Sequence, residues 1–452
     1  MAQIEQSSDQ GMMVEDHLFY LPATMTERWN YTEHRLGTVS ATYDDCPDFT
    51  WQITPSDSEL ISLSDIRLEL EVHLTRADGT PLQTEDCVSP VNNLLHSLFQ
   101  SISVELGGRS ISDTSNLYFL RAYIENLIGF STDAQKSQLT SAGFIIDNNY
   151  TAPYNGVFIP AVQGGARARI TFNSSGAHQR AEMINQISPL QLSGKIHSDI
   201  FQQEKPLLTG VPVFIRLTRA KTALSFTAVD ASHLPKIAIR NPRLFIRKFE
   251  MTPAYSNALA KQLMTTNAMY HIERVTMRQL TLNQNVQFAV WNNVTQGQVP
   301  KIMLLGLVSS AALAGTHDTS PFNFHHYDLM SIHAELNGKI FPSNSYDLDF
   351  TSNNSLQAYN DLLDTLGRLN ESSGELPFSR LVYNKGYTLF GFDFTSSHTG
   401  LKAVALIKQG NLNVHMKFRV ALPETVVVFA MLIYDNVIEI TNNRDVIFNF
   451  AP

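Results

Sequence analysis

Cysteine is scarce in this chain of 452 residues, which contains only Cys46 and Cys87. The two form no Cys-x-x-Cys pair, and neither has a histidine at the spacing typical of a zinc site. The sequence therefore predicts neither a disulfide framework nor structural zinc. We expect two reduced thiols in an intracellular setting.

Positive charge is also in short supply, because 33 Lys and Arg stand against 42 Asp and Glu, for a net charge of −9. Proteins that bind phosphate backbones normally cluster their basic residues on one face. The two basic runs, from Arg167 and from Arg243, alternate with apolar residues as strands do. We therefore expect no sequence-specific nucleic-acid binding and no direct packing against a genome.

Long apolar runs are missing too. The start, MAQIEQSSDQGMMVEDH, is acidic and polar, whereas a secretory signal has a basic start and an apolar stretch, so we expect no export. The most apolar segments, IMLLGLVSSAALAG from Ile302 and TVVVFAMLIY from Thr425, fall short of the ~20 residues that a membrane helix requires. We expect no transmembrane segment, and we predict that both segments are buried strands.

The motifs of common enzymes are absent. His317 and Asp318 are only sequence neighbours, and no Gly-x-Ser-x-Gly motif accompanies them. The runs ELGGRS and QGGARAR lack the pattern of a phosphate-binding loop, and a tight hairpin explains Gly107 and Gly108. We predict no catalytic residue and no cofactor, and we expect that the protein is not an enzyme.

Alternation of apolar and polar residues fills most of the chain. In IRLELEVHL, from Ile66 to Leu74, the apolar residues occupy every second position, as in a strand with one buried face. Most of the chain is therefore predicted to be β. Similar runs are PVFIRLTRA from Pro212, KIAIRNPRLFIRKFEM from Lys236, ERVTMRQLTLNQNVQFAVW from Glu273, LNVHMKFRVAL from Leu412 and NVIEIT from Asn436.

Helical periodicity is confined to three places. In SNLYFLRAYIENLIG the apolar residues fall on one helical face, and we expect Ser115 to cap its start and Gly129 its end. A second helix is predicted in NSLQAYNDLLDTLG from Asn354. A third, within PAYSNALAKQLMTTNA from Pro253, looks like a connector.

One stretch of the sequence occurs twice. The segment 93–108 aligns without a gap with the segment 323–338, and the identical pairs include His96 with His326 and Ile102 with Ile332. Downstream, LRAYIENL from Leu120 aligns with LQAYNDLL from Leu356. We interpret the chain as a tandem duplication of one β unit.

Histidines offer one candidate metal site, made of His317, His325, His326 and His333. Because adjacent strand residues point to opposite faces, we expect that His325 and His326 cannot join one cluster, and we predict no bound metal. His96 and His326 are equivalent in the repeat, and we interpret both as packed side chains with satisfied hydrogen bonds.

Length and repeat together predict the fold class. A chain of 452 residues exceeds the usual size of one core, about 250 to 300 residues. We predict an all-β protein of two tandem eight-stranded antiparallel jelly rolls, with a few short helices in the connections. The expected division is an N-terminal arm at 1–18, a first jelly roll at 19–252, a connector helix at 253–268 and a second jelly roll at 269–452.

Three runs carry a resemblance to a known family: SPVNNLLHSLFQSISVELGGRSIS, NLYFLRAYIENLIGFS and LSGKIHSDIFQQEKPLLTGVPVFIRLTR. They resemble the double jelly-roll major capsid proteins of Polinton (Maverick) elements and adintoviruses. This lineage includes virophage capsid proteins and, more distantly, adenovirus hexon. The resembling segments lie between about Ser89 and Met251, and the second half matches through the repeat.

The resemblance implies a structural protein that forms a homotrimer of pseudo-hexameric outline, whose lattice contacts tile an icosahedral capsid. It further implies penton and minor capsid proteins as partners, and a location in the virion capsid after assembly in the host nucleus or cytoplasm. An alternative is a jelly-roll protein for carbohydrate binding or host attachment, since jelly rolls also serve as lectin domains.

Overall fold

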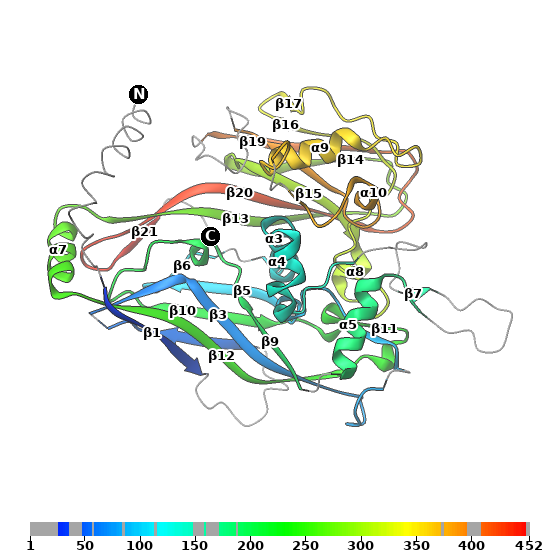
Figure 1. Cartoon of the computed structure of the whole chain (residues 1–452). Coiled ribbons are helices and arrows are strands. Elements are labelled where there is room, and N and C mark those ends of the chain that lie inside the picture. The colour runs from blue at the N-terminus through cyan, green and yellow to red at the C-terminus, as the bar shows by residue number, and fades with distance from the viewer. Residues whose placement is uncertain are drawn as a thin grey trace.

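The chain folds into two halves that lie one above the other, each built of two antiparallel sheets (Figure 1). This computed structural model describes residues 26–35, 48–56, 58–83, 86–112, 115–147, 158–159, 171–186, 189–371, 375–395 and 408–448. The expected N-terminal arm lies outside these residues.

Eight strands of the first half form two four-stranded sheets, and β11 with β4 and β7 with β8 form two small two-stranded sheets. One four-stranded sheet has the order β1-β12-β3-β9 and the other the order β2-β10-β5-β6. The strands are β1 (Thr26–Arg35), β12 (Lys236–Met251), β3 (Glu59–Thr75), β9 (Leu190–Lys195), β2 (Asp48–Ile53), β10 (Val213–Arg219), β5 (Phe99–Leu106), β6 (Arg109–Ser110), β11 (Phe226–Ala228), β4 (Val88–Pro90), β7 (Phe158–Ile159) and β8 (Thr171–Phe172).

The second half repeats this arrangement. Its sheets have the orders β13-β20-β15-β18, with β21 added beside β20, and β14-β19-β16-β17. The strands are β13 (Ala268–Leu282), β20 (Val426–Ile440), β15 (Ile302–Ser309), β18 (Leu389–Asp393), β21 (Val446–Phe448), β14 (Phe288–Gln298), β19 (Gln409–Phe418), β16 (Leu329–Leu336) and β17 (Lys339–Phe341).

The strand order identifies the architecture. Among the eight sandwich strands of either half, numbered along the chain, the first pairs with the eighth, the eighth with the third, and the third with the sixth. The other sheet joins the second, seventh, fourth and fifth strands. This is the double Greek key of a jelly roll. The predicted fold class is confirmed.

The internal repeat is visible in the matched strands β5 and β16. Ile102 and Ile332 are the fourth residues of these strands, which bury the same positions along their length. Both strands end in a hairpin with positive φ at two residues, Gly107 and Gly108 in the first half and Asn337 and Gly338 in the second. Such turns need residues that tolerate positive φ, which the sequence supplies twice.

The three predicted helices are present. α3 (Tyr118–Gly129) and α9 (Leu356–Thr365) both lie in the connection between the fifth and sixth strands of their halves. α7 (Pro253–Leu263) joins the halves at one end of the molecule (Figure 1), where the Thr252 side chain caps its start. The proposed cap of α3 was wrong, because the helix begins after Leu117 without a side-chain cap rather than after Ser115.

Several further elements were not predicted. α8 (Ser310–Ala314) ends the apolar run from Ile302, so only its first part is a strand. The run from Thr425 and NVIEIT belong to the single strand β20. The other elements are α2 (Leu94–Ser97), α4 (Thr132–Lys136), α5 (Ser175–Gln186), α6 (Thr222–Ser225), α10 (Arg380–Tyr383), β4 (Val88–Pro90), β7 (Phe158–Ile159), β8 (Thr171–Phe172), β11 (Phe226–Ala228), and the 3-10 turns η3 (Gln138–Ala142), η4 (Asp199–Gln202) and η5 (Ala231–His233).

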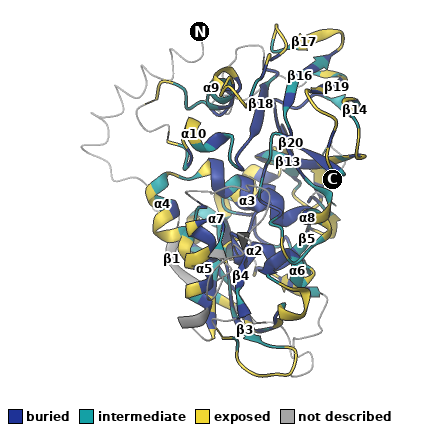
Figure 2. Cartoon of the chain, turned by 90° about the vertical axis from the view of Figure 1, so that its right-hand side faces the viewer, coloured by how far each residue is buried: buried dark blue, intermediate teal, exposed yellow. Residues whose placement is uncertain are grey.

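Buried residues run through both halves and across the region between them (Figure 2). One apolar cluster contains α3 of the first half together with most strands of the second. The other contains the first roll and the beginning of β13. The halves therefore share apolar cores at their junction. Within the described part of the chain, none of the helices is long and apolar enough to cross a membrane.

Candidate functional site

The two jelly rolls meet at a junction where α3 lies against the second half (Figure 1). The ring of Tyr123 stacks on Phe322 with centroids 4.2 Å apart and lies 5.9 Å from Phe324. Phe324 in turn lies 5.0 Å from Phe429 of β20. These aromatic rings connect a helix of the first roll to a central strand of the second.

A buried ionic network occupies the other side of α3. The guanidinium of Arg121 donates to Glu125 at 2.7 Å and to Asp199 at 2.6 Å. Glu125 also lies 2.7 Å from His197, whose ring packs edge-on against His96. The Arg121, Glu125 and Asp199 side chains are 4%, 11% and 1% exposed, so water has little access to these charges.

The titration behaviour of this network follows from one buried cation shared by two carboxylates. Burial disfavours the ionised form of Glu125, but the positive charge of Arg121 and the hydrogen bond with His197 outweigh this effect and lower the pKa of Glu125 to about 2. Burial raises the pKa of Asp199 although Arg121 contacts it. Burial also lowers the pKa of His96 well below its ordinary value, which favours the neutral ring.

The network connects the first roll to the edge strand β13 of the second. The carboxylate of Asp199 accepts the backbone N–H of Val275 at 3.2 Å. Gln203 and Lys205 donate to the backbone carbonyls of His271 at 2.5 Å and Met269 at 3.3 Å. Side chains of the first roll therefore bind backbone groups of an edge strand, which fixes the relative position of the two rolls.

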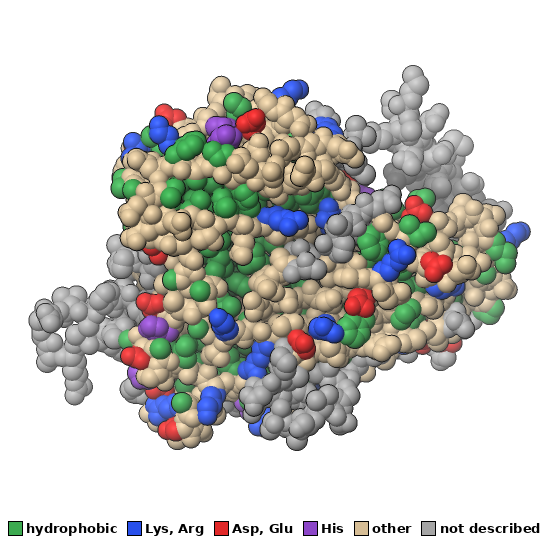
Figure 3. Space-filling view, turned by 180° about the vertical axis from the view of Figure 1, so that it is seen from behind, with side chains coloured by type: hydrophobic (Ala, Val, Ile, Leu, Met, Phe, Trp, Pro, Cys, Tyr) green, Lys and Arg blue, Asp and Glu red, His purple; other side chains and the backbone are tan. Residues whose placement is uncertain are grey.

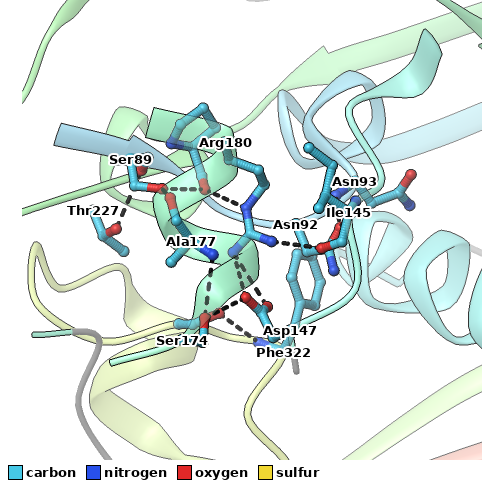
Figure 4. A network of polar contacts seen from close by, with 12 residues as sticks. Ser89, Asn92, Asn93, Ile145, Asp147, Ser174, Ala177, Arg180, Thr227 and Phe322 are labelled. Carbon is cyan, nitrogen blue, oxygen red and sulfur yellow. Dashed lines mark hydrogen bonds and ion pairs between the residues drawn. The ribbon is translucent and has the colours of Figure 1, made fainter. Parts of the chain in front are cut away.

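A second buried ion pair lies beside the junction (Figure 4). Arg180 of α5 donates to Asp147 at 3.0 Å and to the carbonyl oxygens of Pro90 at 2.9 Å and Ile145 at 2.6 Å. The backbone carbonyl of Asp147 accepts the hydroxyl of Tyr387 from the second half at 2.8 Å. Arg180 thereby binds α5 to the rest of the first roll. Asp147, its ion-pair partner, also contacts the second roll through its backbone carbonyl.

A cavity of about 510 Å³ opens between the rolls. The first half contributes Leu117 and Phe119, and the second contributes Met277, Gln279 and Val427. Apolar side chains gather along the middle of the face seen in Figure 3. The residues that line the cavity include no charged side chain, so they offer no general acid or base for catalysis.

A smaller cavity of about 280 Å³ in the second half does contain Glu424 and His325. Both carboxylate oxygens of Glu424 are already bonded, one to the Ser309 hydroxyl at 2.9 Å and the other to the Tyr327 hydroxyl at 2.9 Å. The Nδ1 atom of His325 accepts the backbone N–H of Tyr327 at 3.0 Å. These contacts hold the loop before β16 in place.

The structure corrects one expectation about the histidines. His325 and His326 lie in a loop before β16, where Tyr327 and Asp328 have positive φ, so strand alternation does not apply. Their rings stack with centroids 4.4 Å apart instead of pointing to opposite faces. Among the described residues, no group of three or more His, Cys, Asp or Glu side chains is arranged to hold a metal ion.

The equivalent histidines of the repeat are packed, as predicted. Nδ1 of His96 lies 3.0 Å from the Tyr118 hydroxyl. Nδ1 of His326 accepts the backbone N–H of Asp328 at 3.0 Å, and its ring stacks on Phe350 with centroids 4.1 Å apart. Burial lowers the pKa of His326 to about 3. The rings of both histidines are therefore held by contacts within the protein.

Sequence reasoning missed the ionic network. Arg121 and Glu125, four residues apart in a predicted helix, were a signal for an ion pair. The burial of Arg121 and Glu125 depends on Asp199 and on β13, which are distant in sequence. No local sequence pattern could therefore predict it. The repeat did indicate that the second helix lacks this ion pair, because Gln357 occupies the position of Arg121 there.

Comparison with known sequences gives limited information. No protein-family model matches the chain. An uncharacterized protein of Caenorhabditis elegans is 25% identical to it over 341 residues, which are 74% of this chain and 75% of that protein.

Comparison with solved structures is more informative. A chain of the Sputnik virophage structure matches with a TM-score of 0.57 at 9% identity, over 95% of this chain and 90% of that chain. The chain has the double jelly-roll fold. The Faustovirus major capsid protein matches with a TM-score of 0.52 at 10% identity, over 93% and 91% of the two chains. The model of the PBCV-1 virus capsid gives a TM-score of 0.51 at 11% identity, over 96% and 100%.

Proposed function

We propose that this double jelly-roll protein is the major structural protein of a viral capsid. The observation that carries the proposal is the same eight-strand order in both halves of one chain. The likeness to the Faustovirus major capsid protein over 93% of this chain supports it, since the match includes both rolls and not one alone.

The duplication suits a tile of an icosahedral shell. In our proposal three copies form a homotrimer in which six similar jelly rolls give a pseudo-hexameric outline. Such a capsomer can meet its neighbours through repeated, nearly equivalent contacts and so cover a facet. The buried contacts of Arg121 and Asp199 support this use, because they hold the two rolls of each copy in one fixed arrangement.

The finer assignments remain part of the proposal. The resembling runs between Ser89 and Met251 favour the Polinton or adintovirus type. We further propose penton and minor capsid proteins as partners, assembly in the host nucleus or cytoplasm, and a structural rather than enzymatic role. The division into an arm, two rolls and a connector helix is the unit organisation that we expect in the assembled protein.

Light scattering on the purified full-length chain tests the proposal. We expect a mass of about three times the 50.6 kDa of one chain, and electron microscopy at higher concentration should show hexagonal capsomers or closed shells. A stable monomer at micromolar concentration contradicts the capsid role. A monomer that binds glycans on an array supports the alternative of a carbohydrate-binding or attachment protein.

A further inference from the structure

The two equivalent helices of the repeat are covered differently. On α3, Ala122 faces the core of the first roll, whereas Leu120, Tyr123 and Leu127 pack into the core shared with the second roll. All four side chains are at most 1% exposed. The helix α3 is therefore buried on both sides, on one side by the first roll and on the other by the second roll of the same chain.

On α9 one side is covered and the other is covered only in part, where Tyr359 packs against the core of its own roll. Leu362 is fully buried against β18, where Gly391 lets the helix approach closely. On the other side Leu356 is 43% exposed, and Tyr359 and Leu363 are only partly buried. Leu356, Tyr359 and Leu363, which we call the open face of α9, align with Leu120, Tyr123 and Leu127 of α3.

The apolar surface extends from the open face to the next helix. The Tyr359 ring contacts Tyr383 of α10 with centroids 5.5 Å apart. On the same short helix Leu381 is 80% exposed, the largest exposure of any large apolar side chain in the described residues. Leu356 and Leu381 are therefore exposed apolar side chains on two helices that contact each other. Contiguous exposed apolar surface is typical of a region that another protein covers.

We propose that the open face of α9 binds the first jelly roll of a second copy of this chain, as α3 binds the second roll within one copy. The inference rests on the proposed capsid function and names the surface through which the copies associate.

The contact between the two rolls of one chain indicates that the first roll of a second copy covers the open face. The side of the first roll that carries α3 and Asp199 meets β13, the first and edge strand of the second roll. Its counterpart in the first roll is β1, which among the described strands also lies at a sheet edge, beside β12. If the same head-to-tail contact repeats between copies, α9 of one copy meets the β1 side of the next. A contact of this heterologous type can close into a ring.

Charge substitution on the open face tests the proposal in the full-length protein. We would replace Leu356 and Leu363 with glutamate together, and use Val420→Glu as the matched control, since Val420 is 60% exposed and lies outside α9 and α10. Mass photometry over a concentration series then gives the dissociation constant of the trimer. For the double variant we expect that constant to rise by about 30-fold or more, the loss of one strong interface contact.

The outcomes separate this inference from the proposed function. A trimeric wild type, a dissociated double variant that keeps the circular dichroism spectrum of the wild type, and a trimeric Val420→Glu support the inference. A double variant that stays trimeric at the wild-type dissociation constant overturns the inference and leaves the capsid role standing. A wild type that is monomeric overturns both.

A cross-linking experiment covers the case in which the double variant fails to fold. A photoreactive phenylalanine analogue at position 356 reports its neighbour in the otherwise unaltered assembly. We expect cross-links between copies to peptides within residues 26–251 of the first roll. Cross-links between copies that map only to the second roll overturn the inference.

Discussion

The two jelly rolls have one strand order but different surroundings, as their eighth strands show. Over most of its length β12 of the first roll alternates buried residues with residues that keep some access to water, whereas the first eleven residues of β20 are all buried. The third strands differ in the same way, since β3 alternates from Ile66 to Val72 and β15 is buried along nearly its whole length. The two rolls therefore share their topology. Whether a sheet is buried on one face or on both depends on what packs against it.

Charge follows the same division. The exposed side of β3 and β12 carries ion pairs with partial access to water, such as Arg67 with Glu69 at 3.1 Å and Lys248 with Glu59 at 3.1 Å. The ionic contacts of Arg121 lie instead where the first half meets the second. Residues that are equivalent in the repeat are therefore expected to contribute unequally to the free energy of unfolding.

The largest effect is expected for Arg121→Ala. The substitution leaves Glu125 and Asp199 buried without their cation, which commonly costs about 3–5 kcal/mol of unfolding free energy. Its counterpart Gln357→Ala, at an exposed position of α9, should stay within about 0.5 kcal/mol. Urea unfolding of both variants measures the difference, and equal losses would show that the two helices have the same role.

Truncation of equivalent leucines should give the next largest difference. Leu120→Ala creates a cavity in the shared core and should destabilise the protein by about 2–5 kcal/mol at any protein concentration. Leu356→Ala removes a side chain that is 43% exposed, so at nanomolar concentration its effect should be about 1 kcal/mol or less. Thermal unfolding at two concentrations tests this, because a second copy on α9 would make only the Leu356 effect grow with concentration.

Acid should destabilise both rolls through the equivalent histidines. His96 and His326 have folded pKa values below the 6.5 of an unfolded histidine, so the unfolded chain binds more protons once the pH falls below about 6.5. For His326 this loss, ~1.4 kcal/mol per pH unit, should continue down to its folded pKa of about 3. The contribution of Glu125 is present above pH 4.5 and is lost as the pH falls towards about 2.

The slope of unfolding free energy against pH between 6.5 and 5.5 measures the histidine effect. His326→Gln should lower that slope by about one proton, because glutamine does not titrate. An unchanged slope in this variant would mean that His326 is protonated equally in the folded and unfolded chain.

The smallest effect is expected on the exposed side of the first roll. Arg67 is 49% exposed and pairs with Glu69, so Arg67→Ala should change the unfolding free energy by at most about 1 kcal/mol. Raising the salt concentration should reduce even this change, since exposed pairs are screened. A loss as large as that of Arg121→Ala would place Arg67 in a buried contact and remove the contrast between the two sheets.

Much of the fold was predictable because its signals are local. Alternation located β3 and β12, and the unbroken apolar run from Thr425 indicated the doubly buried β20. The helix α5 was missed, since few of its residues are apolar and its anchor is the buried pair of Arg180 with Asp147. Cys46 lies outside the described residues, so the absence of a disulfide stays a prediction.

Local patterns in the sequence specify the repeated succession of strands along the chain, through alternation, the two hairpin turns at Gly107–Gly108 and Asn337–Gly338, and the repeat of one helix. Which copy of that helix is buried on both sides, and which keeps an open face, depends instead on how the two rolls pack together. The tertiary structure also stacked His325 on His326 and joined Arg121 to Asp199. The physical reason is that alternation and turns act between neighbouring residues, whereas burial depends on segments that meet only when the two rolls pack together.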